Sequence, residues 1–178
     1  MTTAYIGLGS NLGDPLDLVR KGWQALGEDP RVRLVRLSSP YRSEPVGMES
    51  DNWFINAAGE VETSLSPLEL LGLLHAIEHR FGRERDPAAG YQDRTLDLDL
   101  LLYGNLVLRE GGGQVPHPSL HERLFVLQPL AEIASGVMHP VSGRTIGELL
   151  ASLLDRGGNP VVEKTGWRVG APEEPPEE

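Results

Sequence analysis

Hydrophobic residues recur along the first third of the chain with spacings typical of different elements. Residues 3–9 form a short apolar run that ends in glycines, as a buried strand does. Asp14 and Pro15 provide a helix start, because a carboxylate accepts from first-turn amides and proline needs no amide partner there. Apolar residues at helical spacing extend this helix up to Gly27. Residues 32–37 mix apolar and basic side chains, which predicts a half-exposed strand.

The middle of the chain continues with a strand, a helix and another strand. Residues 54–61 are a strand candidate that Gly59 and two alanines weaken. Ser66–Glu69 has the serine, proline and glutamate of a capping box, so a helix begins there. Its apolar stripe continues until Gly82. After a polar loop, residues 96–103 predict a further strand.

The last third predicts a turn, a short return strand and two more helices. The turn is at Gly104-Asn105, the return strand at 106–108, and the helical stretches at 120–134 and 145–154. The overall order strand–helix–strand–strand–helix–strand is the split unit of ferredoxin-like folds. We therefore predict an α+β ferredoxin-like sandwich. Its largely antiparallel sheet carries both long helices on one face, with the C-terminal helices added.

Length and composition fit one ordinary domain of 178 residues, with 39% hydrophobic and 24% charged residues. Cysteine is absent, which excludes disulfides, thiolate metal sites and a cysteine nucleophile. We place a single domain at residues 1–160 and a C-terminal extension at 161–178. From about residue 171 the extension carries four glutamates, three prolines and no base, so we expect it to be disordered.

The charge of the chain limits the classes of molecule that it is expected to bind. A net charge of −10 argues against general nucleic-acid binding. No apolar stretch is long enough to span a bilayer and no secretory signal is evident, so we expect a cytoplasmic protein without a membrane partner. Of the 16 basic residues 14 are arginines, and four of these fall within residues 80–94. Such a cluster in an acidic protein predicts a small anionic ligand.

The segment Arg94–Leu100 carries the most informative chemistry. On a strand, its leucines face one side and Asp97 and Asp99 the other, with the two aspartate α-carbons ~6.6 Å apart. Two carboxylates on one face repel unless a cation lies between them. Magnesium suits such a pair because it takes one or two carboxylates and completes its shell with water and phosphate oxygens. The alternative is the solvated face of an edge strand.

The neighbouring polar loop favours the metal interpretation. Arg83, Arg85 and Arg94 flank the carboxylates, and together they resemble the parts used for phosphoryl transfer. Pro87 and Gly90 suggest a mobile loop that could close over a triphosphate. A solvated basic loop is the plainer alternative.

Two other patterns compete for a function. The glycines of Gly7–Gly13 lie between a strand and a helix, but their spacing differs from a dinucleotide fingerprint, so we interpret them as a tight turn. His75, Glu78 and His79 match the H-x-x-E-H pattern of inverted zinc peptidases. No residue later in the chain stands out as the third protein ligand that a catalytic zinc needs.

Four motifs, taken together and in this order, resemble the 6-hydroxymethyl-7,8-dihydropterin pyrophosphokinase family over about residues 3–155. They are Ala4–Gly13, Phe54–Ala58, Arg94–Asp99 and Val115–Pro118. The resemblance implies a ferredoxin-like transferase of folate biosynthesis. Such an enzyme moves the β,γ-pyrophosphoryl group of ATP onto the hydroxymethyl group of the pterin and releases AMP.

The resemblance also implies site residues. Asp97 and Asp99 would hold two magnesium ions, and the arginines of the loop would neutralise charge in the transition state. The implied catalytic residues are Arg83, Arg94, Asp97 and Asp99. ATP, as co-substrate, would be bound by Arg83, Arg94, His117 and Arg123. The pterin would be bound by Ser43, Val46, Phe54, Asn56 and Phe125. The same pocket would be lined by His75, Glu78 and Tyr91.

Two alternatives to this magnesium-dependent diphosphotransferase remain open at the level of sequence. A non-catalytic ferredoxin-like sensor of a small ligand would keep the pocket but would not need the carboxylate pair. A zinc peptidase would use His75, Glu78 and His79. For the transferase we expect ATP and a reduced pterin as partners, and a monomer rather than an obligate oligomer.

Overall fold

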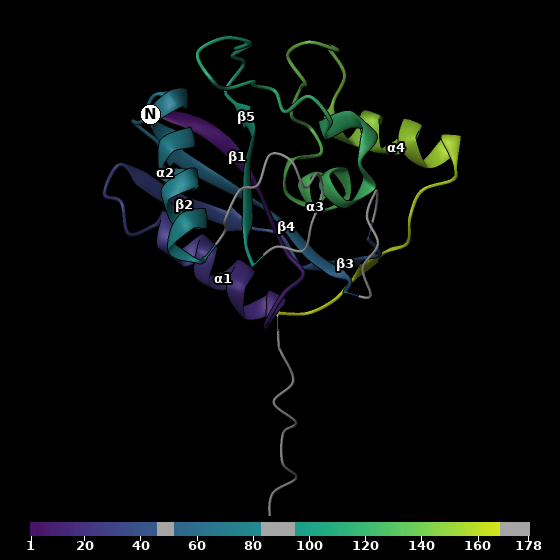
Figure 1. Ribbon diagram of the computed structural model, residues 1–178. Coiled ribbons are helices and arrows are strands. Elements are labelled where there is room, and N and C mark those ends of the chain that lie inside the picture. Colours follow the sequence, from purple (N-terminus) through teal and green to yellow (C-terminus); the bar gives the residue numbers. More distant parts are fainter. Residues whose placement is uncertain (46–51, 83–94, 168–178) are drawn as a thin grey trace, which may run out of the picture.

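The computed structural model of the protein describes residues 1–45, 52–82 and 95–167 (Figure 1). A single six-stranded sheet lies between two pairs of helices. The elements in chain order are β1 (Thr2–Ser10), α1 (Pro15–Leu26), β2 (Val32–Leu37), β3 (Tyr41–Ser43), β4 (Phe54–Thr63), α2 (Pro67–Arg80), β5 (Asp97–Tyr103), a 3₁₀ turn (Leu120–Glu122), α3 (Leu124–Ala134), α4 (Ile146–Arg156) and β6 (Val162–Lys164).

The sheet is antiparallel, as the sequence predicts. β1 lies at its centre between β5 and β4, and every strand pairing in the described residues is antiparallel. β4 is long enough for β2 and β3 to pair with different parts of its outer edge, and β6 adds to β3. The arrangement β5-β1-β4-β2 is the ferredoxin-like order, so the predicted fold class is confirmed.

Helices α1 and α2 cover one face of the sheet, as predicted (Figure 1). Both begin as the sequence indicates: Asp14 accepts a hydrogen bond from the Asp17 amide, and Ser66 forms a full capping box with Glu69. Their apolar stripes bury the larger of the two cores against the sheet. The side chains packed between these helices and the sheet are mainly apolar.

Helices α3 and α4 cover part of the other face and bury a second core. The predicted helical stretch 120–134 is divided, because Arg123 has an extended backbone (φ −116°, ψ 111°) between the 3₁₀ turn and α3. The predicted return strand at 106–108 is reduced to one bridge between Leu108 and Val115. α3 begins only after Arg123 and runs from Leu124 to Ala134.

A β-bulge shapes β5. Tyr5 of β1 pairs with Leu102 and Ile6 pairs with Leu100, so Leu101 is an extra residue in the ladder. Because of this extra residue, Leu101 and Leu102 both belong to the second core. Before the bulge the strict alternation holds: Leu98 and its neighbouring leucines lie in the first core, and the aspartates face the other way.

No helix in the described part of the chain is both long and apolar enough to cross a membrane.

Candidate active site

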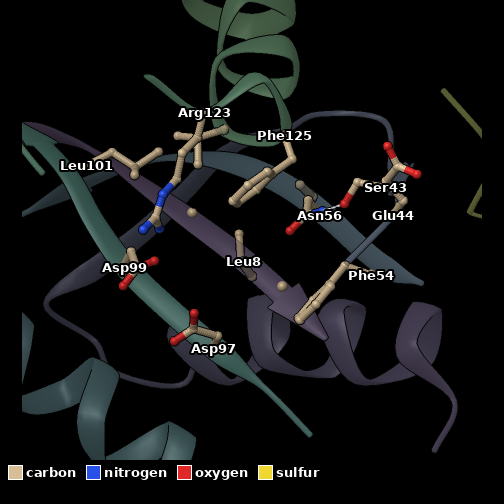
Figure 2. A pocket seen from close by; sticks show the side chains of 14 residues that line it. Leu8, Ser43, Glu44, Phe54, Asn56, Asp97, Asp99, Leu101, Arg123 and Phe125 are labelled. Atoms are coloured by element: carbon tan, nitrogen blue, oxygen red, sulfur yellow. Dashed lines mark hydrogen bonds between the residues drawn. The ribbon is translucent and has the colours of Figure 1, made fainter. Parts of the chain in front are cut away.

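A pocket opens on the α3 side of the sheet, beyond the N-terminus of α3 (Figure 2). Four strands or their ends and the start of α3 contribute to its wall. The described lining residues are Gly7, Leu8, Gly9, Ser43, Glu44, Phe54, Asn56, Ala57, Asp97, Asp99, Leu101, Arg123, Phe125 and Val126. The lining residues are therefore spread over the chain from Gly7 to Val126, and only the fold brings them together.

Two glycines keep the floor of the pocket open. Gly7 and Gly9 lie within β1 rather than in a turn, so the interpretation of this segment as a tight turn is wrong for them. A β-carbon on Gly9 would lie 3.0 Å from Oδ1 of Asn56, and one on Gly7 would lie 3.3 Å from Leu101. Of Gly7, Gly9 and Gly13, only Gly13, with φ +65°, has the turn conformation that favours glycine. The missing side chains of Gly7 and Gly9 thus leave space for Leu101 of β5 and Asn56 of β4.

One wall of the pocket is acidic. Asp97 and Asp99 project from β5 on the same side, and Arg123 extends toward them from the segment before α3 (Figure 2). The separation of faces predicted from alternation is therefore confirmed. Opposite charges meet in a partly enclosed space, where their interaction is stronger than in bulk water.

Two hydrogen bonds to the backbone of β5 hold its outer edge at this wall. Glu78 of α2, only 2% exposed, accepts a hydrogen bond from the Leu98 amide at 3.1 Å. The His117 amide donates to the Leu101 carbonyl at 3.0 Å. Since the Leu98 amide lies between Asp97 and Asp99, the buried Glu78 carboxylate holds the strand that carries the acidic pair.

His117 stands beside the charged wall with a defined tautomer. Its Nδ1 accepts a hydrogen bond from the Ser119 amide at 3.2 Å, so the neutral ring carries its proton on Nε2. Burial lowers the pKa of His117 below 6.5, and the positive charge of Arg123 lowers it further, while Asp97 acts in the opposite direction. At neutral pH the ring is therefore an uncharged hydrogen-bond donor.

This electrostatic coupling predicts that Arg123→Ala raises the pKa of His117 toward 6.5, because a nearby positive charge is removed. An NMR titration of the histidine rings measures the change. The pKa of His139 is the internal control, since burial and His121 lower it and Arg123 has no part in it. A His117 titration unaffected by the substitution would contradict the coupling.

The same shift gives a stability trend. The folded protein binds the His117 proton less tightly than the unfolded chain, so the contribution of His117 to the free energy of unfolding decreases as pH falls below 6.5.

The other end of the pocket is lined by two phenylalanines and by the side-chain amide of Asn56. Phe54 of β4 and Phe125 of α3 lie on two sides of the opening in front of Asn56 (Figure 2). Nδ2 of Asn56 donates to Oγ of Ser43 at 2.7 Å, and both side chains are buried. This bond uses one of the two amide protons of Asn56 and fixes the orientation of its amide. Two rings beside an oriented amide can bind a flat heterocycle through stacking and directed hydrogen bonds.

The structure brings together most of the described residues predicted for the site. Those that line the pocket are Ser43, Phe54, Asn56, Asp97, Asp99, Arg123 and Phe125. His117 lies close enough to interact electrostatically with Asp97 and Arg123. The remaining loop predictions lie outside the described residues: Val46, Arg83, Tyr91 and Arg94.

His75 and Glu78 are not among the described lining residues. Glu78 is buried against Leu98 of β5, whereas the side chains of His75 and His79 are on exposed positions of α2. The three do not form a shared site, and no group of three or more metal-ligating side chains is found in residues 1–45, 52–82 and 95–167. The zinc interpretation has no support in this geometry.

The acidic pair suits a different metal. Asp97 and Asp99 offer hard oxygen donors on one face and border an open pocket. A magnesium ion binds with so few protein ligands because it retains waters and accepts phosphate oxygens. The donor set therefore fits magnesium held jointly with a phosphorylated ligand.

Sequence reasoning missed several lining residues, chiefly Leu8, Glu44, Ala57, Leu101 and Val126. Leu101 could be found only through the bulge, because simple alternation gives no sign of an inserted residue. Glu44 directly follows Ser43, and its side chain accepts a hydrogen bond from the Val161 amide. That partner lies 117 positions later in the chain, so no local pattern indicates the contact.

Comparisons with known proteins find similar sequences over most of the chain. The family model described as 7,8-dihydro-6-hydroxymethylpterin-pyrophosphokinase matches residues 5–135. A Haemophilus influenzae protein named 2-amino-4-hydroxy-6-hydroxymethyldihydropteridine pyrophosphokinase is 43% identical over 155 residues, covering 87% of this chain and 95% of that protein. A Bacillus subtilis protein of the same name is 45% identical over 134 residues, covering 75% and 79%.

Solved structures agree on the fold. The structure of wild-type Plasmodium falciparum HPPK-DHPS with pteroate has a TM-score of 0.71 at 13% identity, over 87% of this chain. The match spans 45% of that longer chain, so it concerns one portion of it.

Proposed function

Because this chain belongs to the 7,8-dihydro-6-hydroxymethylpterin-pyrophosphokinase family, we propose that it transfers pyrophosphate from ATP to 6-hydroxymethyl-7,8-dihydropterin, releasing AMP, in folate biosynthesis. The observation that carries the proposal is the composition of one pocket. A carboxylate pair faces Arg123 at one end, and two phenylalanines flank a buried amide at the other.

The aromatic end would bind the pterin. Phe54 and Phe125 are placed to stack on the two sides of its ring. Asn56 and Ser43 would hydrogen-bond the ring edge, where a pterin presents both donors and acceptors. Since their mutual hydrogen bond already fixes both side chains, little conformational entropy is lost on binding.

The charged end would bind the triphosphate. Arg123 supplies a fixed positive charge, and neutral His117 can donate from Nε2 to a phosphate oxygen. Asp97 and Asp99 would hold two magnesium ions. Magnesium held by these carboxylates would neutralise charge on the phosphates. Arg83 and Arg94, outside the described residues, are proposed to add positive charge in the transition state.

The reaction then requires chiefly alignment. The hydroxyl oxygen of the pterin bonds to the β-phosphorus while the bond from that phosphorus to the α,β-bridging oxygen breaks. AMP leaves, and the hydroxyl proton is released. Because the pterin slot and the charged wall are parts of one pocket, the chain can hold the two substrates side by side and convert a two-substrate encounter into an oriented one. Since one chain supplies both the acidic pair and the aromatic pair, we propose that the reaction needs no residue from a second chain.

Phosphorus NMR of ATP, magnesium, the reduced pterin and the purified protein tests the function. We expect AMP and a pterin diphosphate, formed only when the pterin is present. ADP would instead indicate an ordinary kinase, and pterin binding without turnover would favour the small-ligand sensor. Omission of magnesium, with a chelator present, is expected to stop AMP formation. Unchanged turnover under that condition would contradict the role proposed for Asp97 and Asp99.

A further inference from the structure

The segment that follows α4 runs along the outer edge of the sheet and ends near α1 (Figure 1). We call residues 161–167 the C-terminal strap. Its strand β6 pairs with β3, with Ser43 opposite Val162 and Tyr41 opposite Lys164. The strap follows the segment matched by the family model, which ends at residue 135, and the predicted domain boundary at 160 stays a prediction.

At one end the strap contacts the pocket wall. The Glu44 amide donates to the Val161 carbonyl at 3.3 Å, and the Val161 amide donates to Oε1 of Glu44 at 2.9 Å. Glu44 lines the pocket, and its neighbour Ser43 accepts the hydrogen bond from Asn56. Two reciprocal bonds therefore connect the strap to the residue beside the Ser43–Asn56 pair.

At its other end the strap is anchored to parts of the fold that do not belong to the pocket. Nε1 of Trp167 donates to the Ser38 carbonyl at 3.1 Å, and the Thr165 amide donates to the Pro40 carbonyl at 2.9 Å. Arg20 of α1 donates to the Trp167 carbonyl at 2.6 Å, and its guanidinium lies 5.6 Å from the indole ring centroid. These contacts join the strap to α1 and to the chain entering β3.

The strand that carries Ser43 is short. β3 has three residues and pairs with the end of β4 on one side and with β6 on the other. Without β6 it would be a three-residue edge strand, and so short a ladder holds its end weakly. The Ser43–Glu44 edge of the pocket is thus supported from outside by the strap.

We propose that the C-terminal strap positions the Ser43–Glu44 edge for binding of the pterin. This inference rests on the proposed function. It assigns to residues 161–167 a role specific to one substrate: the strap contacts the edge that carries Ser43, whereas the acidic wall is held separately by Glu78 and by the His117 backbone. Weakening the strap should therefore affect pterin binding and leave ATP binding nearly unchanged.

Two pairs of variants test this proposal. The chain truncated after Pro160 loses the strap, whereas the chain truncated after Trp167 keeps it. Val161→Pro removes the amide that donates to Glu44, and Val161→Ala retains it. For the strap-less chain and for Val161→Pro we expect the KM for the pterin to rise about tenfold, as loss of a directed hydrogen-bond contact would produce. The KM for ATP should change less than about twofold on the same scale.

The outcomes separate this proposal from the proposed function. If the unaltered chain neither binds the pterin nor forms AMP, the proposed function is refuted. An active unaltered chain whose Val161→Pro variant keeps the pterin KM would overturn the strap proposal alone. Equal losses for both substrates, or equal effects of Val161→Pro and Val161→Ala, would also overturn it, because they would indicate general destabilisation. If the strap-less chain fails to fold, the Val161 pair decides.

Discussion

Asp97→Asn is expected to lower kcat/KM by more than about a thousandfold, because a neutral amide cannot hold a divalent ion beside the triphosphate. Its side chain lies on the pocket face of β5, away from the leucines of the first core. The fold should therefore persist, and the melting temperature should change little, because the lost attraction to Arg123 is offset by relief of the repulsion between the two aspartates. Steady-state kinetics and a thermal melt of the same preparation measure both effects.

Asp155→Asn is the matched control. Asp155 is exposed on α4 and is not among the described lining residues, so the same chemical change should leave kcat/KM within about twofold of the unaltered chain. An Asp97→Asn enzyme with near-normal turnover in magnesium would refute the assignment. A large fall in melting temperature would show that Asp97 is needed for folding instead.

Gly59→Ala is expected to lower the free energy of unfolding by about 3 kcal/mol through overpacking. Gly59 lies in β4 against the indole ring of Trp23, which is 8% exposed. A β-carbon at this position would overlap atoms Cζ3, Cε3 and Cη2 of the ring. Trp23 is packed into the first core, so either the helix α1 or the strand must move. Urea unfolding followed by circular dichroism gives the difference.

Gly72→Ala makes the identical chemical change where there is room. Gly72 is exposed in α2, and a β-carbon there would meet nothing within 4 Å. Alanine is the better helix former by up to about 1 kcal/mol, so this variant should be as stable as the unaltered chain or more so. Similar losses at both positions would contradict the steric explanation. With Trp23→Leu as background, the cost of Gly59→Ala should largely disappear.

The same glycine illustrates what local patterns convey. In sequence, Gly59 weakens the prediction of a strand at 54–61, since glycine has no side chain to pack. In the structure the strand extends from Phe54 to Thr63, and Gly59 is the place where Trp23 fits. The partner lies 36 positions earlier on a helix, so no local rule could have shown that the glycine supports the strand's packing.

The site was predictable where a single strand carried the information. Alternation placed Asp97 and Asp99 on one face, and the structure bears this out. Leu101 was missed because a bulge breaks the alternation, and the division at Arg123 was missed because its extended backbone interrupts an otherwise helical pattern. The roles proposed for Ser43, Asn56, Phe54 and Phe125 came from the resemblance to a family, since nothing in their own neighbourhoods distinguishes them.

The sequence by itself determined the ferredoxin-like order of elements, the helix starts at Asp14 and Ser66, and the acidic face of β5. Each depends on residues at most a few positions apart, where spacing and capping chemistry act directly. Only the tertiary structure decided that Gly9 makes room for Asn56, that Glu78 holds the Leu98 amide, and that residues 161–167 reach Glu44. Those contacts join segments far apart in the chain, and they exist because the sheet and both helix layers bring them together.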